Sequence, residues 1–162
     1  MKKILIFGNS GAGKSTLAKK LKFKFELQHL DLDILAWLDT QPPSRRPLNE
    51  SYNDIDEFLS ENNSWVIEGG YADLLDYVTN QANDIIFLNP GTEVCIEHCR
   101  NRPWEPHKYT SKDEQDKNLN MLIGWVKDYE KRDDAFSLKA HKSLFNSFSG
   151  KKIEISDEEN IF

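Results

Sequence analysis

A glycine-rich segment near the start of the chain has the residue types and the spacing that are needed to hold phosphate. It reads Gly8-Asn9-Ser10-Gly11-Ala12-Gly13-Lys14-Ser15-Thr16. Glycines let a backbone curl so closely around an anion that successive N–H groups point at it, and a following helix N-terminus adds positive potential. Lys14 brings an ammonium group to the β- and γ-phosphates, and Ser15 offers an oxygen to Mg²⁺. The segment predicts a binding site for a nucleoside triphosphate with magnesium. ATP is the expected nucleotide, and GTP is left open.

Two aspartates, Asp31 and Asp33, follow a short apolar segment. If the chain stays extended there, the two side chains point to the same side, because side chains alternate along a strand. The carboxyl ends of parallel strands are also where open α/β sheets bind ligands. Phosphoryl transfer needs a metal ligand and a group that faces the acceptor, and two carboxylates could fill both roles. Alternatively, Asp33 caps a short helix predicted over residues 34–38.

Four arginines could supply positive charge near a transferring phosphate. Arg45 and Arg46 lie in a proline-rich segment, where a guanidinium fork suits a carboxylate or phosphate on an acceptor; ordinary surface charge is the alternative. Arg102 and Arg132 lie near the two ends of a polar and helical region. Arginines that arrive when a lid closes can stabilise charge on the γ-phosphate and help to exclude water. Their alternative role is to complement the dipole at a helix end.

The elements that must position these groups alternate along the chain. Short apolar runs bounded by turn residues predict strands over residues 3–7, 28–30, 65–68, 84–88 and 151–155. Apolar residues at helical spacing predict helices over 15–25, 34–38, 49–61, 71–81, 92–102, 112–132 and 136–148. The three prolines of segment 41–47 predict a loop. Strands that alternate with helices predict an α/β fold, with a parallel sheet covered on both faces.

Composition limits the partners and the compartment. Asp and Glu outnumber Lys and Arg by 27 to 21, which gives a net charge of −6 and argues against a nucleic-acid partner. No apolar stretch approaches the roughly 18 residues of a membrane span. Cys95 and Cys99, four residues apart, predict core thiols rather than a disulfide framework or, with His98 and His107, a zinc site. We expect a cytoplasmic protein with a single domain over residues 1–162, and its oligomeric state is left open.

Three segments of the chain resemble the shikimate kinase and adenylate kinase superfamily of small P-loop phosphotransferases. They are residues 8–16, His29-Leu30-Asp31-Leu32-Asp33 and Glu68-Gly69-Gly70. The resemblance is closest to the kinase-like "DNA topology modulation protein" family, which shares the Asp-x-x-x-Trp arrangement seen from Asp33 to Trp37. It implies a three-layer P-loop NTPase fold with five parallel strands in the order 2-3-1-4-5. It also implies an acceptor-binding segment after the second strand and a mobile lid between the fourth and fifth strands.

The same resemblance implies roles for single residues. Asp31 would help Ser15 to hold Mg²⁺, directly or through water. Asp33 would contact the acceptor hydroxyl and could act as its base. Gly69 and Gly70 would approach the acceptor through their backbone.

The resemblance also implies a lid over about residues 101–134. Arg102-Pro103 resembles the start of the shikimate kinase lid. Lys131-Arg132-Asp133-Asp134 resembles the Arg-x-Asp-Asp stretch that closes the adenylate kinase lid, although lysine stands at the expected arginine position and arginine at the next. The region is also longer than a shikimate kinase lid.

Together these features predict an ATP- and magnesium-dependent phosphotransferase that acts on a small-molecule or nucleotide acceptor. The predicted catalytic residues are Lys14, Asp33, Arg102 and Arg132. The predicted acceptor-binding residues are Asp33, Arg45, Arg46, Gly69 and Gly70. The alternative is a nucleotide-binding regulatory protein, or a slow NTPase, without a metabolite acceptor.

Overall fold

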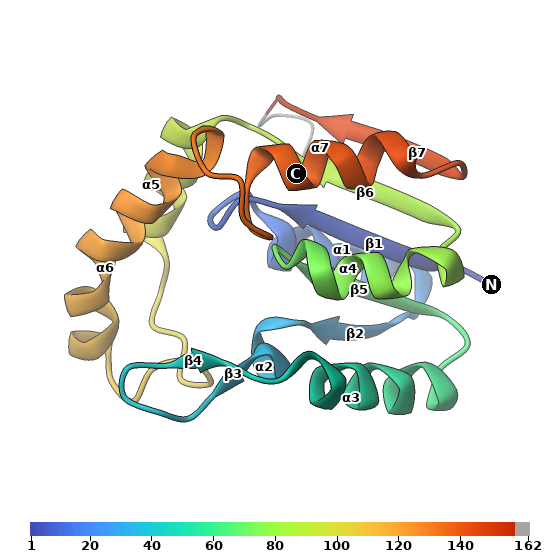
Figure 1. Cartoon of the computed structure of the whole chain (residues 1–162), viewed down its shortest axis with the longest axis horizontal. Helices are drawn as coiled ribbons and strands as arrows, with labels where there is room; N and C mark the ends of the chain where they lie inside the picture. Colours follow the sequence, from blue (N-terminus) through green and yellow to red (C-terminus); the bar gives the residue numbers. More distant parts are fainter. Residues whose placement is uncertain (158–162) are drawn as a thin grey trace.

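The computed structural model describes residues 1–157 and is built around one sheet of five parallel strands (Figure 1). The strands are β1 (Lys3–Gly8), β2 (Gln28–Asp31), β5 (Trp65–Gly69), β6 (Asp84–Leu88) and β7 (Lys151–Ile155). They lie side by side in the order β2-β5-β1-β6-β7. Numbered within this sheet alone, the order is 2-3-1-4-5. The predicted P-loop NTPase fold and its strand order are therefore confirmed, and residues 158–162 of the predicted domain lie outside the described part.

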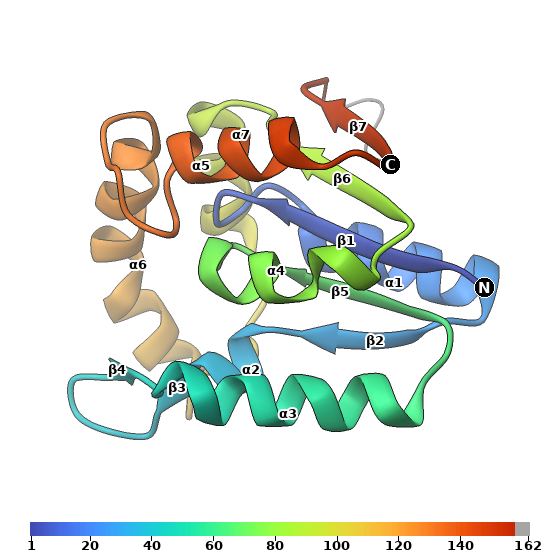
Figure 2. The ribbon, with the colours of Figure 1, turned by 45° about the vertical axis from the view of Figure 1, so that its right-hand side comes forward.

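Helices cover both faces of the sheet (Figures 1 and 2). One face packs against α3 (Leu48–Glu61), α4 (Ala72–Val78) and α7 (Leu138–Ser147). The rings of Phe7 and Phe87, from neighbouring strands, stack there with centroids 5.2 Å apart. This apolar layer buries one face of β1 and β6 against the helices.

The other face packs against α1 (Lys14–Phe25), α5 (Thr92–Asn101) and α6 (Lys112–Lys127). Cys95 and Cys99 are free, buried thiols within this layer, as the sequence predicts. Because α1 begins directly after the glycine-rich segment, its N-terminus points toward any anion held there. No helix within residues 1–157 is long and apolar enough to cross a membrane.

The segment after β2 differs from the prediction. The helix α2 covers only Asp33–Ala36, and Trp37–Leu38 (β3) pairs antiparallel with Ser44–Arg45 (β4). The predicted loop 41–47 is therefore partly a two-stranded ribbon. Its prolines 42 and 43 lie in the turn, where their missing N–H groups cost no ladder hydrogen bond.

The long helix predicted over residues 112–132 also ends earlier than expected. It was expected to reach Arg132, but α6 stops at Lys127 and a 3-10 turn, η2 (Asp128–Glu130), follows. Tyr129 in this turn is buried, and its hydroxyl lies 2.6 Å from the Nδ1 atom of His141. We attribute the break to this contact, which holds the Tyr129 side chain in the core. A similar turn, η1 (Thr79–Gln81), extends α4 over the rest of the helix predicted for 71–81.

Candidate active site

The glycine-rich segment forms a tight loop between β1 and α1. Gly11 and Gly13 have φ angles of 81° and 98°, which lie in the left-handed region that glycine adopts readily. A Cβ atom on Gly11 would also lie 2.3 Å from the carbonyl oxygen of Cys95. On the same loop, the Gly11 carbonyl lies 2.7 Å from Nδ1 of His98. Helix α5 therefore packs against the loop and leaves no room for a side chain at Gly11.

Lys14 is held close to this loop. Its ammonium group donates a hydrogen bond to the carbonyl oxygen of Asn9 at 2.7 Å. Burial lowers the pKa of Lys14 below its ordinary value, while the carboxylates of Glu68 and Asp33 act in the opposite direction. A cation that has lost part of its hydration is suited to bind a phosphate, which restores a full set of charge-assisted hydrogen bonds.

Ser15 contacts a carboxylate that the sequence analysis did not select. Its hydroxyl donates to Oε1 of Glu68 at 2.9 Å, and Nε2 of His29 lies 3.6 Å from the same oxygen. The Glu68 residue is 1% exposed. An acidic residue at the end of an otherwise apolar strand was the available signal, since only a functional partner or a hydrogen bond makes such burial favourable.

Asp31 lies beside Glu68 because the two are paired in the register of β2 and β5. Burial raises the pKa of Asp31 to about 7, and the carboxylates of Glu68 and Asp33 add to the shift. Within residues 1–157, no three His, Cys, Asp or Glu side chains are arranged to hold a metal alone. Mg²⁺ does not require that arrangement, because it keeps several waters and takes phosphate oxygens. The hard oxygens of Ser15, Asp31 and Glu68, with excess negative charge, fit this ion.

The backbone around Asp33 differs from the extended strand that was predicted. The strand ends at Asp31, and Asp33 begins α2, so the two carboxylates do not follow an extended strand. The Asp33 amide instead donates to Oδ1 of Asp31 at 2.9 Å. The hydroxyl of Tyr71 donates to Oδ1 of Asp33, and the ammonium group of Lys108 donates to Oδ2 at 2.6 Å. Its position in the first turn of α2 also differs from the capping alternative.

Lys108 is the second functional candidate that the sequence did not reveal. It lies in the connection 102–111 between α5 and α6, which runs toward α2 and β3 in both views (Figures 1 and 2). Its Nζ atom lies 3.8 Å from Oδ2 of Asp31 and 3.4 Å from Oε2 of Glu105. Burial lowers the pKa of Lys108, but the carboxylates of Asp33 and Asp31 outweigh it and raise the pKa. The connection between α5 and α6 is thus attached to the aspartate pair.

The aspartate pair is bordered by aromatic rings. The indole N–H of Trp37 donates to the hydroxyl oxygen of Tyr71 at 2.8 Å, and Tyr71 in turn donates to Asp33. The rings of Trp37 and Phe136 are nearly parallel, with centroids 6.5 Å apart. The Arg45 guanidinium carbon lies 5.0 Å from the centre of the Tyr71 ring. One aromatic group therefore links the candidate base to the β3–β4 ribbon.

The predicted arginines reach different places. Arg45 donates to both oxygens of Asp73 at 3.2 and 3.3 Å, near the aromatic rings. Arg46 donates to Asp54 on α3 at 2.6 Å and to the Leu35 carbonyl, so these contacts hold it against α3 and not at the aspartate pair.

The two arginines of the predicted lid region, Arg102 and Arg132, also make different contacts. Arg102 forms an ion pair with Glu105 at 3.3 Å, and its charge helps to lower the pKa of Lys14. Arg132 stacks over the Trp125 ring at 4.1 Å and forms an ion pair with Asp134 at 3.2 Å. Arg102 is therefore electrostatically close to the phosphate loop, whereas the contacts of Arg132 brace the end of α6.

Gly69 and Gly70, which are predicted to contact the acceptor, lie at the end of β5 and are closely packed. A Cβ atom on Gly69 would lie 2.9 Å from that of Leu32. The Gly70 carbonyl accepts a hydrogen bond from Nε2 of His141 at 2.7 Å. Because a carbonyl can only accept, Nε2 carries the proton and Nδ1 accepts from Tyr129. Burial lowers the pKa of His141 to about 4, so this ring stays neutral.

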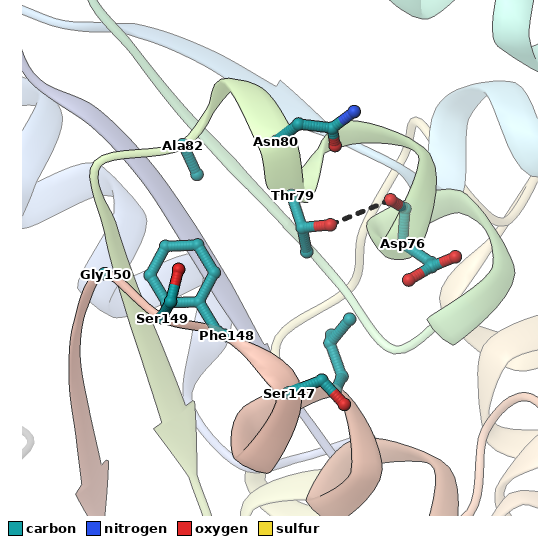
Figure 3. A pocket seen from close by; sticks show the side chains of 9 residues that line it. Asp76, Thr79, Asn80, Ala82, Ser147, Phe148, Ser149 and Gly150 are labelled. Carbon is teal, nitrogen blue, oxygen red and sulfur yellow. Dashed lines mark hydrogen bonds between the residues drawn. The ribbon is translucent and has the colours of Figure 1, made fainter.

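A surface hollow elsewhere on the molecule does not belong to this site. Figure 3 shows it between the end of α4, the turn η1 and the end of α7. It lies before the first residues of β6 and β7, at the opposite edge of the sheet from the phosphate loop. Its polar groups are mainly Asp76, Thr79, Asn80 and serines, and the Thr79 hydroxyl is already bonded to the Asp76 carbonyl. The candidate active-site residues lie at the opposite edge of the sheet, at the carboxyl ends of β1, β2 and β5.

Comparison with known proteins gives the fold but no family. No protein-family model matches the chain. The uncharacterized protein YqaC of Bacillus subtilis (strain 168) is 29% identical over 104 residues, which cover 64% of this chain and 58% of that protein. A gluconokinase from Sinorhizobium meliloti 1021 matches with a TM-score of 0.56 and 14% identity, over 96% of this chain and 83% of that one. The likeness shows a P-loop kinase fold. The closer resemblance to the "DNA topology modulation protein" family stays a prediction.

Proposed function

We propose that the chain is an ATP- and magnesium-dependent phosphotransferase that transfers the γ-phosphoryl group to a hydroxyl acceptor. The supporting observation is an unbroken series of contacts from the phosphate loop to the candidate base. Ser15 bonds to Glu68, Glu68 is paired with Asp31, and Lys108 joins Asp31 to Asp33. A kinase needs its phosphate site and its acceptor site to share one space in this way.

In this proposal the loop amides and Lys14 hold the β- and γ-phosphates. Ser15, Asp31 and Glu68 would hold Mg²⁺, partly through water, and the ion would neutralise charge on the phosphates. Gly69 and Gly70 keep the backbone close to the acceptor. Arg102 adds positive charge over the loop when the lid closes.

Asp33 orients the acceptor hydroxyl. Transfer forms a bond between the acceptor oxygen and the γ-phosphorus, and breaks the bond from that phosphorus to the β–γ bridging oxygen. The electron pair of the broken bond leaves with ADP, and the hydroxyl proton passes to Asp33. Because Oδ2 of Asp33 now accepts from Lys108, the hydroxyl must share or replace that hydrogen bond.

The test is transfer itself. Purified protein with Mg²⁺ and γ-labelled ATP is incubated with a panel of sugars, polyols, nucleosides, nucleotides and sugar acids, and labelled products are identified by mass spectrometry. We expect at least one labelled product, and its loss in Lys14→Ala. ATP hydrolysis that no panel member accelerates, without any labelled product, would favour the slow NTPase or regulatory alternative.

A further inference from the structure

Within residues 1–157, three cations on the acceptor side of the candidate site are already balanced by carboxylates. Arg45 pairs with Asp73, Lys108 with Asp33, and Arg102 with Glu105.

Four carboxylates surround these three cations, namely Asp31, Asp33, Asp73 and Glu105. A phosphomonoester would add about 1.5 to 2 negative charges near pH 7. To bind one there, the protein would have to break an existing ion pair and leave a partly buried carboxylate without its partner, which is costly.

The Arg45–Asp73 pair is the most restrictive of these contacts. Arg45 reaches both oxygens of Asp73, and its guanidinium carbon lies 5.0 Å from the Tyr71 ring and 5.4 Å from the Phe136 ring. The side chains of Arg45 and Asp73 are only 24% and 30% exposed. Arg45 uses only Nη2 for these bonds, and its buried Nε has no hydrogen-bond partner within residues 1–157. Its charge is nevertheless balanced by Asp73, so an anion would have to compete with that carboxylate for the guanidinium.

A flat apolar surface lies beside the candidate base. Trp37 is 41% exposed, although Phe136 lies nearly parallel to its ring and the Arg45 guanidinium carbon lies 5.9 Å from the ring centre. Its N–H edge is fixed through Tyr71, whose hydroxyl bonds to Asp33. These two hydrogen bonds orient the indole relative to the carboxylate. Indole faces stack with nucleobases and with the apolar faces of sugar rings.

Building on the proposed function, we propose that the acceptor is an uncharged, hydroxylated ring compound: a nucleoside or a monosaccharide. Its ring stacks on Trp37 and one hydroxyl reaches Asp33. The internal ion pairs of Arg45 and Lys108 exclude phosphomonoesters and carboxylates. The group transfer is the one written above, with the ring hydroxyl as the attacking oxygen.

The experiment compares kcat/KM for matched acceptors with the intact chain and Mg-ATP. One arm holds nucleosides and another holds monosaccharides. The anionic arms hold nucleoside monophosphates, sugar phosphates and sugar acids. We expect an uncharged arm to exceed every anionic arm by at least roughly 100-fold, and the better uncharged arm identifies the source. Faster transfer to an anionic arm overturns this inference and leaves the proposed kinase intact. No transfer to any arm overturns both.

Two variants test the cause of this preference. Asp73→Asn releases the Arg45 guanidinium, so the ratio of anionic to uncharged kcat/KM should rise about tenfold or more. Trp37→Ala should raise KM for the uncharged acceptor roughly three- to tenfold, and Trp37→Phe less, since a flat ring remains. Phe23→Ala removes another exposed aromatic ring, on α1, and serves as the matched control. An unchanged ratio in Asp73→Asn, with the fold intact by circular dichroism, contradicts the role of the ion pair.

Discussion

The nucleotide side and the acceptor side of the candidate site treat charge in opposite ways. On the nucleotide side, Lys14 is bonded to a loop carbonyl, and burial lowers its pKa. On the acceptor side, Lys108 and Arg45 are each held by carboxylates of the chain. The first region is prepared to receive an anion, while the second is already neutralised. Under the proposed function, this difference would let one small site select a highly charged donor and an uncharged acceptor at the same time.

The largest expected effect is on the nucleotide side. Lys14→Ala should lower kcat/KM for ATP on the order of 10³-fold, because no other cation replaces an ammonium group inside the loop. Nucleotide titration by calorimetry should show the matching loss of affinity. Lys19→Ala removes an exposed lysine from the same helix and should leave both quantities unchanged. Wild-type affinity in Lys14→Ala would falsify the phosphate-loop assignment.

A smaller loss is expected on the acceptor side. Asp33→Asn should lower kcat about 10²-fold while nucleotide affinity stays within about twofold, because the amide cannot accept the hydroxyl proton. Steady-state kinetics and calorimetry separate the two effects. Asp39→Asn neutralises an exposed aspartate near the same ribbon and is the control. Equal losses of kcat and nucleotide affinity would mean that the two sides are not separate.

The pH dependence of kcat tests whether Lys108 controls the charge of Asp33 on the acceptor side. Burial pulls the pKa of Asp33 upward, but the charge and hydrogen bond of Lys108 outweigh it, and the net pKa is lowered. Lys108→Met should therefore raise this pKa and move the acid limb of the kcat–pH profile up by about one pH unit. Lys108→Arg keeps the charge and should leave the limb near its wild-type position. A limb that does not move in Lys108→Met excludes this electrostatic role.

The smallest effect concerns Asp31 and stability. Its folded pKa of about 7 lies above the ordinary 3.8, so its stabilising contribution is full below pH 3.8 and is lost as pH rises through 7. Asp31→Asn cannot ionise and keeps an oxygen for the Asp33 amide. Without metal or nucleotide, its melting temperature should match wild type near pH 4 and exceed it by roughly 2–6 °C at pH 8. A constant difference between pH 4 and pH 8 contradicts the raised pKa.

Local patterns predicted the parts of the molecule that are local in sequence. The strands 84–88 and 151–155 have the bounds that their apolar runs indicate, and the phosphate loop is contiguous. The acceptor side is assembled differently: 75 residues separate Lys108 from Asp33, and 38 separate Tyr71 from Asp33. Neither periodicity nor residue spacing predicts such contacts. The sequence therefore indicates Asp33 as a site residue but not its partners.

Wrongly predicted ends of helices also arise from contacts between residues that are distant in sequence. The helical pattern of α6 continues past Lys127, but the buried contact of Tyr129 with His141 overrides it. The acceptor role of Arg46 stays a prediction, but its guanidinium donates to Asp54 on α3, a partner that the proline-rich segment does not indicate. Helical spacing reports which side of a helix is apolar. It does not predict which distant residue a polar or aromatic side chain will contact.

The buried Asn9 side chain has a mechanical consequence. Its Nδ2 atom donates to the Val126 carbonyl at 3.2 Å, so the last turn of α6 is fastened to the phosphate loop. The first turn of α6 instead contacts the connection 102–111, where Gln115 accepts from the Glu105 amide and donates to the Pro103 carbonyl. Amide hydrogen exchange should therefore be slow around Val126 and faster in the first turn of α6. Nucleotide that tightens the loop would then slow exchange further around Val126, through the Asn9 hydrogen bond.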